Sequence, residues 1–190
     1  MMVSAPQWST AVAGALAAIG LAFSGLLAIG PASAQPTPGT VVPPELQPPG
    51  PAVVGLRANA RGVQVYDCAL NAQGGGYGWV LKGPDAVLYD EAGAVVAKHY
   101  AGPTWEARDG SKVVGEVVAH LDAPGHAGVP WLLLRGKPAE QPGTLAAVTY
   151  IQRIDTQGGL APATGCDADH QNAEERAPYN ATYVFYRAPR

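Results

Sequence analysis

The feature that most constrains the fold is a repeated alternation between short β-forming runs and clusters of Gly, Pro and Asp. From Val63 onwards, runs of four to eight β-branched and aromatic residues are separated by such turn-forming clusters. The chain contains 24 Gly and 18 Pro, and both residue types interrupt helices. Regular turns without a sustained helical period predict an all-β sandwich or barrel with a single core.

We expect about eight or nine short strands, in residues 63–70, 77–81, 86–89, 94–98, 104–108, 111–119, 131–135, 144–155 and 179–186. Two hairpins can be assigned from their turns. Residues 90–93 connect one pair of runs, and Asp109-Gly110 connects another as a preferred two-residue type I′ turn. Only residues 167–177 have a helical pattern, so at most one short helix is predicted.

Residues 1–34 have the pattern of a secretory signal peptide. Residues 11–29 are uncharged and mostly apolar, and Ala32-Ser33-Ala34 supplies the small residues of a cleavage site. The alternative is an uncleaved membrane anchor, because 19 apolar residues nearly span a bilayer. Cleavage predicts a secreted, periplasmic or extracellular protein, and membrane contact is expected only if the segment is retained.

Residues 35–52 form a Pro-rich segment in which 7 of 18 residues are Pro. Because Pro fixes φ and lacks an N–H, this segment is predicted to be an extended linker or an arm along the edge of the domain. Residues 53–190 are expected to form one all-β domain, since a chain of this length supports a single core.

Cys68 and Cys166 are the only cysteines in the chain. In an exported protein, an isolated pair of this kind predicts a disulfide that ties the start of the domain to its end. A redox-active or metal-binding pair is the alternative, but the Cys-x-x-Cys spacing that favours a reactive thiol is absent.

The charge pattern and the motifs exclude several functions. The formal net charge is −3, and the 12 Lys and Arg residues form no basic stripe, so nucleic acid is not expected as a partner. Ser111 is the only serine after residue 34, and it lies outside any Gly-x-Ser-x-Gly motif. No cofactor and no metal ligand set is predicted, because the four histidines show neither His-x-His nor His-Glu-x-x-His spacing.

Trp105 is the best candidate for a binding residue. Trp and Tyr combine a flat apolar face with a polar edge, which suits sugars as well as half-buried core positions. His99, Glu106 and Asp109 lie near it in the sequence. We therefore predict a binding or structural surface module with a carbohydrate or cell-wall ligand, and core packing is the alternative role of Trp105.

The competing hypothesis is a secreted enzyme or metalloprotein with a site near His99, Trp105 and Glu106. An enzyme requires His99 to meet a carboxylate, such as Glu106 or Asp109, in one cleft. Strict strand alternation, however, points Glu106 away from Trp105. No catalytic residue is assigned.

Several motifs together resemble one family: residues 62–68 (GVQVYDC), 98–105 (KHYAGPTW), 109–111 (DGS), 129–134 (VPWLLL), 150–159 (YIQRIDTQGG) and 165–166 (GC). It is the domain-of-unknown-function family 3455, uncharacterised exported proteins of bacteria and fungi. The resemblance covers about residues 41–187. It implies secretion and a single domain, and it implies no catalytic residue.

Overall fold

The structure is a computed structural model that describes residues 39–71, 74–138 and 141–190. The predicted signal peptide lies outside these residues. Within them the chain forms eight strands: β1 (Val53–Leu70), β2 (Tyr77–Tyr89), β3 (Val95–Tyr100), β4 (Thr104–Ala107), β5 (Lys112–Leu121), β6 (Trp131–Pro138), β7 (Val148–Gly158) and β8 (Glu174–Arg187). Three 3-10 turns complete the elements: η1 (Pro44–Leu46), η2 (Pro124–His126) and η3 (Ala168–His170). Among the described residues, no helix has the length and hydrophobicity needed to cross a membrane.

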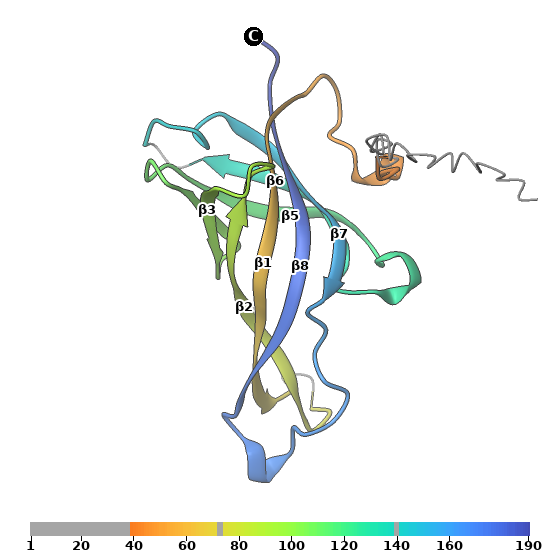
Figure 1. The fold of residues 1–190 in the computed structure, drawn as a ribbon. Coiled ribbons are helices and arrows are strands. Elements are labelled where there is room, and N and C mark those ends of the chain that lie inside the picture. The colour runs from red at the N-terminus through yellow and green to blue at the C-terminus, as the bar shows by residue number, and fades with distance from the viewer. Residues whose placement is uncertain (1–38, 72–73, 139–140) are drawn as a thin grey trace, which may run out of the picture. The chain divides into compact units, whose positions relative to one another are not determined.

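The eight strands form a closed antiparallel barrel (Figure 1). Each strand pairs with the next one in the sequence, and β8 closes the barrel by pairing with β1 over a long register, from Val53↔Arg187 to Asp67↔Glu174. The all-β prediction is confirmed. Of the two predicted architectures, a sandwich and a barrel, the chain forms the barrel. Closure leaves no unpaired sheet edge along the barrel wall.

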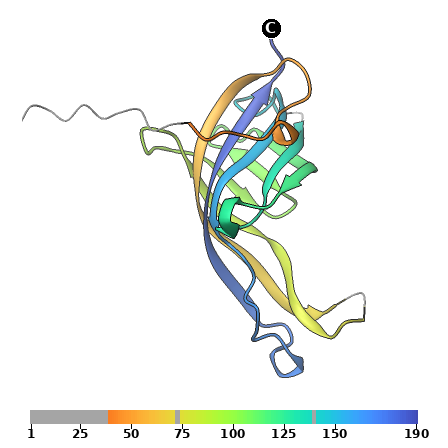
Figure 2. The same cartoon turned by 90° about the vertical axis from the view of Figure 1, so that its right-hand side faces the viewer.

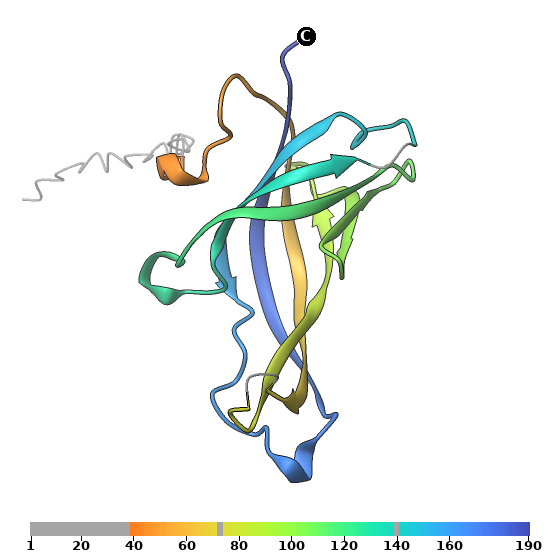
Figure 3. The same cartoon turned by 180° about the vertical axis from the view of Figure 1, so that it is seen from behind.

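Three strands continue beyond one end of the barrel (Figures 2 and 3). Residues 63–70 of β1 pair there with residues 77–85 of β2 and 174–178 of β8. On the far sides, β3 pairs with β2 only from Asp85 onwards, and β7 pairs with β8 only from Tyr179 onwards. We call this three-stranded projection the extension.

The barrel interior combines aliphatic, alanine and aromatic side chains. Trp105 on β4 and Tyr179, Tyr183 and Phe185 on β8 are all buried, together with small residues such as Ala86. Inward positions on β8 alternate with outward ones, as the sequence pattern of 179–186 predicts. The aromatic side chains of the core therefore come from β4 and β8, and the alanines are its smallest members.

The Pro-rich segment is described from Gly39 onwards, and it packs on the outer surface of the barrel. Leu46 in η1 is fully buried in a second cluster with Trp131, Leu133, Ile154 and Val184. The Gln152 Nε2 donates to the Leu46 carbonyl oxygen at 2.6 Å, and the Thr40 hydroxyl donates to Asp155 at 2.6 Å. This part of the segment is thus an ordered arm.

Both predicted hairpins are confirmed, but one turn type is wrong. Tyr89 pairs with Val95 across residues 90–94, and Glu106 pairs with Lys112 across the second turn. In the second hairpin the Ala107 N–H donates to the Ser111 carbonyl, and only Gly110 has a positive φ. This geometry is a three-residue connection with glycine in the left-handed position, whereas a type I′ turn needs two positive φ values.

Two further expectations are corrected by the structure. Residues 167–177 form only the short η3 turn, and from Glu174 onwards they belong to β8. The runs 77–81 and 86–89 are one strand, because Gly83 and Pro84 stay paired with β1 and form no turn, and a β-bulge at Lys82 takes up the register shift. Gly83 has a φ of 151°, and a Cβ there would lie 2.8 Å from the Ala101 Cβ, so glycine is required.

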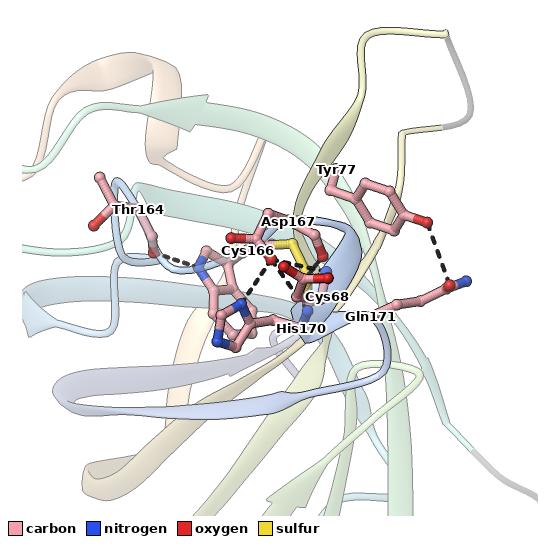
Figure 4. Close-up of a disulfide and its surroundings, with 9 residues drawn as sticks. Cys68, Tyr77, Thr164, Cys166, Asp167, His170 and Gln171 are labelled. Atoms are coloured by element: carbon pink, nitrogen blue, oxygen red, sulfur yellow. Dashed lines mark hydrogen bonds and ion pairs between the residues drawn. A yellow bond between two sulfur atoms is a disulfide. The ribbon is translucent and has the colours of Figure 1, made fainter.

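The predicted disulfide between Cys68 and Cys166 is confirmed, with the two Cα atoms 5.3 Å apart (Figure 4). It joins β1 in the extension to the loop between β7 and β8. The indole N–H of Trp79 donates to the Thr164 carbonyl at 2.9 Å, and the backbone N–H of Cys68 donates to the Ala173 carbonyl. The bridge and these bonds hold the loop against the extension.

Candidate functional site

A cavity of about 230 Å³ lies inside the barrel, at the end from which the extension departs. Every strand contributes to its lining: Gln64 (β1), Leu81, Lys82, Gly83 and Pro84 (β2), His99 (β3), Trp105 (β4), Val117 (β5), Leu132 and Leu134 (β6), Arg153 (β7) and Tyr183 (β8), with Gly102 and Pro103 from the β3–β4 turn. Leu81 and Val117 are about half exposed, and therefore form an apolar rim. The cavity is thus a product of barrel closure, and no single strand or hairpin forms it.

His99 lies buried in the cavity wall, with only 2% of its surface exposed. Its Nδ1 lies 2.9 Å from the Thr104 carbonyl oxygen, and because a carbonyl only accepts, this nitrogen carries the proton. Nε2 is then an acceptor. Burial lowers the pKa of His99 from 6.5 to about 3, with a smaller contribution from the charge of Arg153, so the imidazole is neutral at physiological pH.

His99 and Trp105 form a stacked pair that gives the cavity a rigid wall. Their ring centroids are 4.2 Å apart and the rings are 4° from parallel. Tyr183 meets both rings edge-on, at 5.2 Å and 5.4 Å. Aromatic contacts of both geometries are favourable beyond the area they bury, so these three side chains support one another.

Polar atoms in this wall lack partners. Gln64 Nε2 and Trp105 Nε1 are buried without a hydrogen bond to another described residue. The buried hydroxyls of Tyr179 and Tyr183 interact with each other, and that of Tyr183 also interacts with Arg153. Buried polar groups are nearly always hydrogen-bonded, and each unmet one costs about 1–3 kcal/mol. The two unpartnered donors in one cavity wall indicate a site in which an additional molecule can supply hydrogen-bond acceptors.

The cavity also contains charged side chains. The Arg153 Nε and Nη2 both donate to the Pro130 carbonyl oxygen, at 3.1 Å and 2.9 Å. Lys82 at the rim is neutralised by Asp67 and Glu174, with its Nζ 3.3 Å and 3.1 Å from their carboxylate oxygens.

The predicted site residues do not all meet. His99 and Trp105 lie together in the cavity wall, but Glu106 is on the outer face of β4, as strand alternation predicts. There it accepts from the Tyr100 hydroxyl at 2.9 Å and pairs with Lys112 at 3.2 Å. These contacts lower the pKa of the Glu106 carboxyl. The histidine–carboxylate cleft that an enzyme would need is therefore not formed by His99 and Glu106.

Asp109 organises the β4–β5 turn and does not line the cavity. Its carboxylate accepts from the backbone N–H and hydroxyl of Ser111 and from the same two groups of Thr144, at 2.6–3.0 Å. These four bonds hold the pKa of Asp109 well below its usual range. Among the described residues, no group of three or more His, Cys, Asp or Glu side chains could hold a metal ion.

Comparison with known protein families identifies the family of this chain. Residues 48–187 match a family described as "Protein of unknown function (DUF3455)". The chain belongs to this family. No curated protein and no solved structure matches it. The matched region of this DUF3455 protein includes all eight strands, the disulfide and the cavity.

Three cavity residues of this DUF3455 protein were missed by sequence reasoning: Gln64, Arg153 and Tyr183. A usable signal existed for Gln64, because it shares the alternation of Tyr66 and Cys68 and is thus a polar residue on an inward face. Tyr183 gave a similar signal, because it lies on the same face of its strand as Tyr179 and Phe185. Arg153 gave no such signal, since its approach to the other two depends on how the barrel closes.

Proposed function

We propose that the barrel binds a small, largely apolar molecule in its cavity, and that binding rather than catalysis is its activity. The observation that carries this proposal is a pair of buried, unpartnered donors, Gln64 Nε2 and Trp105 Nε1, in the wall of a cavity lined mainly by apolar side chains. Closed eight-stranded barrels are wide enough to enclose one small ligand. The signal-peptide pattern of residues 1–34 and the disulfide support an exported protein, because disulfides persist in oxidising compartments.

The cavity volume limits the ligand. An engineered cavity of roughly 150 Å³ holds one benzene molecule. The 230 Å³ cavity therefore accommodates about ten non-hydrogen atoms. The parallel His99 and Trp105 rings offer a flat surface beside that space, which suits an aromatic or other planar ligand.

A carbohydrate is the alternative ligand, predicted from the aromatic residues of the sequence. A monosaccharide carries several hydroxyl groups, each of which loses its hydration when it enters an apolar cavity. Leu81, Val117, Leu132 and Leu134 offer these hydroxyls no partner. The lining thus favours a less polar ligand.

The test uses ligand-observed NMR with two probes that match the cavity volume: indole, which is planar, and xylose, a pentose of about ten non-hydrogen atoms, as the carbohydrate probe. We expect the protein to bind indole with a Kd below about 1 mM, as the usual binding energy per ligand atom allows, and not to bind the sugar. Binding of the sugar alone would favour the carbohydrate hypothesis, and binding of neither would overturn the proposal.

A matched pair of variants locates the binding site. Val117 is half exposed and lines the cavity, whereas its neighbour Val118 has similar exposure and does not line it. Val117→Trp should fill the entrance and weaken indole binding at least tenfold, and Val118→Trp should leave it unchanged. Equal effects of the two substitutions would place indole outside the cavity.

A further inference from the structure

We infer that the ligand of this cavity carries a carboxylate and that Arg153 anchors it. This inference rests on the binding function proposed above and specifies the chemical class of the ligand. It follows from the charge inside the cavity, from the hydrogen-bonding groups of its wall and from the volume available.

Arg153 is a partly buried residue without a counter-charge in the part of the chain that the structure describes. None of the ion pairs among the described residues includes it, so no Asp or Glu oxygen lies within 4 Å of its nitrogens. It donates to the Pro130 carbonyl through Nε and Nη2 and also interacts with the Tyr183 hydroxyl, whereas a guanidinium has five N–H donors. Arginine is rarely buried without a partner, and an anionic ligand would supply that partner.

The other ionisable groups in the wall do not compensate this charge. Lys82 is already paired with two carboxylates at the rim, and His99 is neutral. The positive charge of Arg153 favours the anionic form of Tyr66, Tyr179 and Tyr183, although burial dominates and raises the pKa of each of these tyrosines. The same field would stabilise an anion in the cavity.

The unpartnered neutral groups also match a carboxylate. Trp105 Nε1 can only donate, and the Gln64 amide nitrogen also donates. A carboxylate only accepts, at about four positions, and its hydrogen bonds to a guanidinium are about twice as strong as neutral ones. A phosphate would bring a second charge that one arginine cannot neutralise in a mostly apolar cavity.

The experiment compares benzoate and benzamide, two planar probes of the same size that differ in charge. Titration calorimetry at pH 7 and low salt should give a Kd at least tenfold lower for benzoate than for benzamide. Raising the salt concentration to 1 M should reduce this preference only slightly, because a partly buried pair is weakly screened.

Substitution of Arg153 tests its role as the anchor. Arg153→Met should remove the preference for benzoate and change the affinity for benzamide less than twofold. Arg135→Met is the matched control, because it removes the same charge from an exposed residue of β6 that does not line this cavity. This control should keep the full preference.

The outcomes separate the inference from the proposed function. Equal affinities of the wild-type protein for benzoate and benzamide would overturn the carboxylate inference and leave binding in the cavity intact. Failure of both probes and of indole to bind would overturn the proposed function itself. If Arg153→Met does not fold, Arg153→Lys keeps the charge but loses the planar fork, and an intermediate preference for benzoate is expected. Unchanged preference in a folded Arg153→Met protein would contradict the anchoring role.

Discussion

At the scale of single residues, the environment of His99 has consequences for stability. In the unfolded chain its pKa is near 6.5, whereas in the folded protein burial lowers it to about 3. Only the unfolded state therefore takes up a proton as the pH falls between these values. The His99 contribution to stability is complete above the unfolded pKa and decreases as the pH falls towards the folded pKa.

We predict that the free energy of unfolding decreases by about 2 kcal/mol between pH 6.5 and 4.5, from one proton per molecule. Urea unfolding at several pH values measures this decrease. His99→Phe preserves an aromatic ring against Trp105 and should remove most of the decrease, whereas His120→Gln, at an exposed histidine, should not. A His99→Phe protein with the wild-type pH dependence would show that other groups cause it.

Residue types alone revealed only part of the site. His99 and Trp105 were predicted to share a site because they lie close together in the sequence, and the structure shows that they pair across one tight hairpin. Gln64 and Arg153 are 89 positions apart in the sequence (153 − 64) and meet only through barrel closure, which local patterns do not encode. The burial of both Gln64 and Tyr183 could have been predicted from alternation, but not which cavity they share.

At the scale of elements, the β4–β5 hairpin depends on Asp109. Its four hydrogen bonds link the turn to Thr144 in the β6–β7 connection. Because the carboxylate accepts all four bonds, the folded state holds its pKa below that of the unfolded chain. The stabilisation from Asp109 is present above the unfolded pKa, near 3.9, and is lost as the pH falls through the lower folded pKa.

We predict that Asp109→Asn lowers the thermal midpoint at pH 7, because an amide nitrogen replaces one accepting oxygen. The substitution should also reduce the loss of stability on acidification from pH 4 to 2. Differential scanning calorimetry measures both effects. Asp90→Asn is the matched control in the other hairpin, where the Asp90 side chain accepts from the Ala94 N–H and from no other described residue, and a smaller effect is expected. Equal effects in the two hairpins would contradict the proposed importance of the Thr144 link.

The elements also show why strand boundaries were predicted incompletely. Gly83 and Pro84 are typical turn residues, but here they pair with Val65 and Gln64 of β1, next to a β-bulge at Lys82. The polar residues 174–176 were predicted as part of a helix, yet they pair with β1 in the extension. In both cases, pairing with a distant strand overrides the local preference.

At the scale of the whole molecule, the disulfide and the β1–β8 pairing join the beginning of the domain to its end. Cys68 and Cys166 are 98 residues apart, and their bridge lies beyond the end of the barrel, where the β7–β8 loop contacts the extension. This bridge was predicted from the sequence, because an isolated pair of cysteines in an exported protein is expected to be oxidised. The sequence did not predict that the bridge lies outside the barrel, because the extension results from the unequal strand lengths.

We predict that replacing both cysteines with alanine lowers the free energy of unfolding by about 2–5 kcal/mol, since closing a loop of this length restricts the unfolded chain. Urea unfolding of the double variant, compared with the oxidised wild-type protein, measures the change. Reduction of the wild-type protein should produce a similar loss. The folded double variant should still bind indole, because neither cysteine lines the cavity and closure of the barrel by β1 and β8 does not require the bridge. Loss of indole binding in a folded double variant would show that the extension and its loop also shape the cavity.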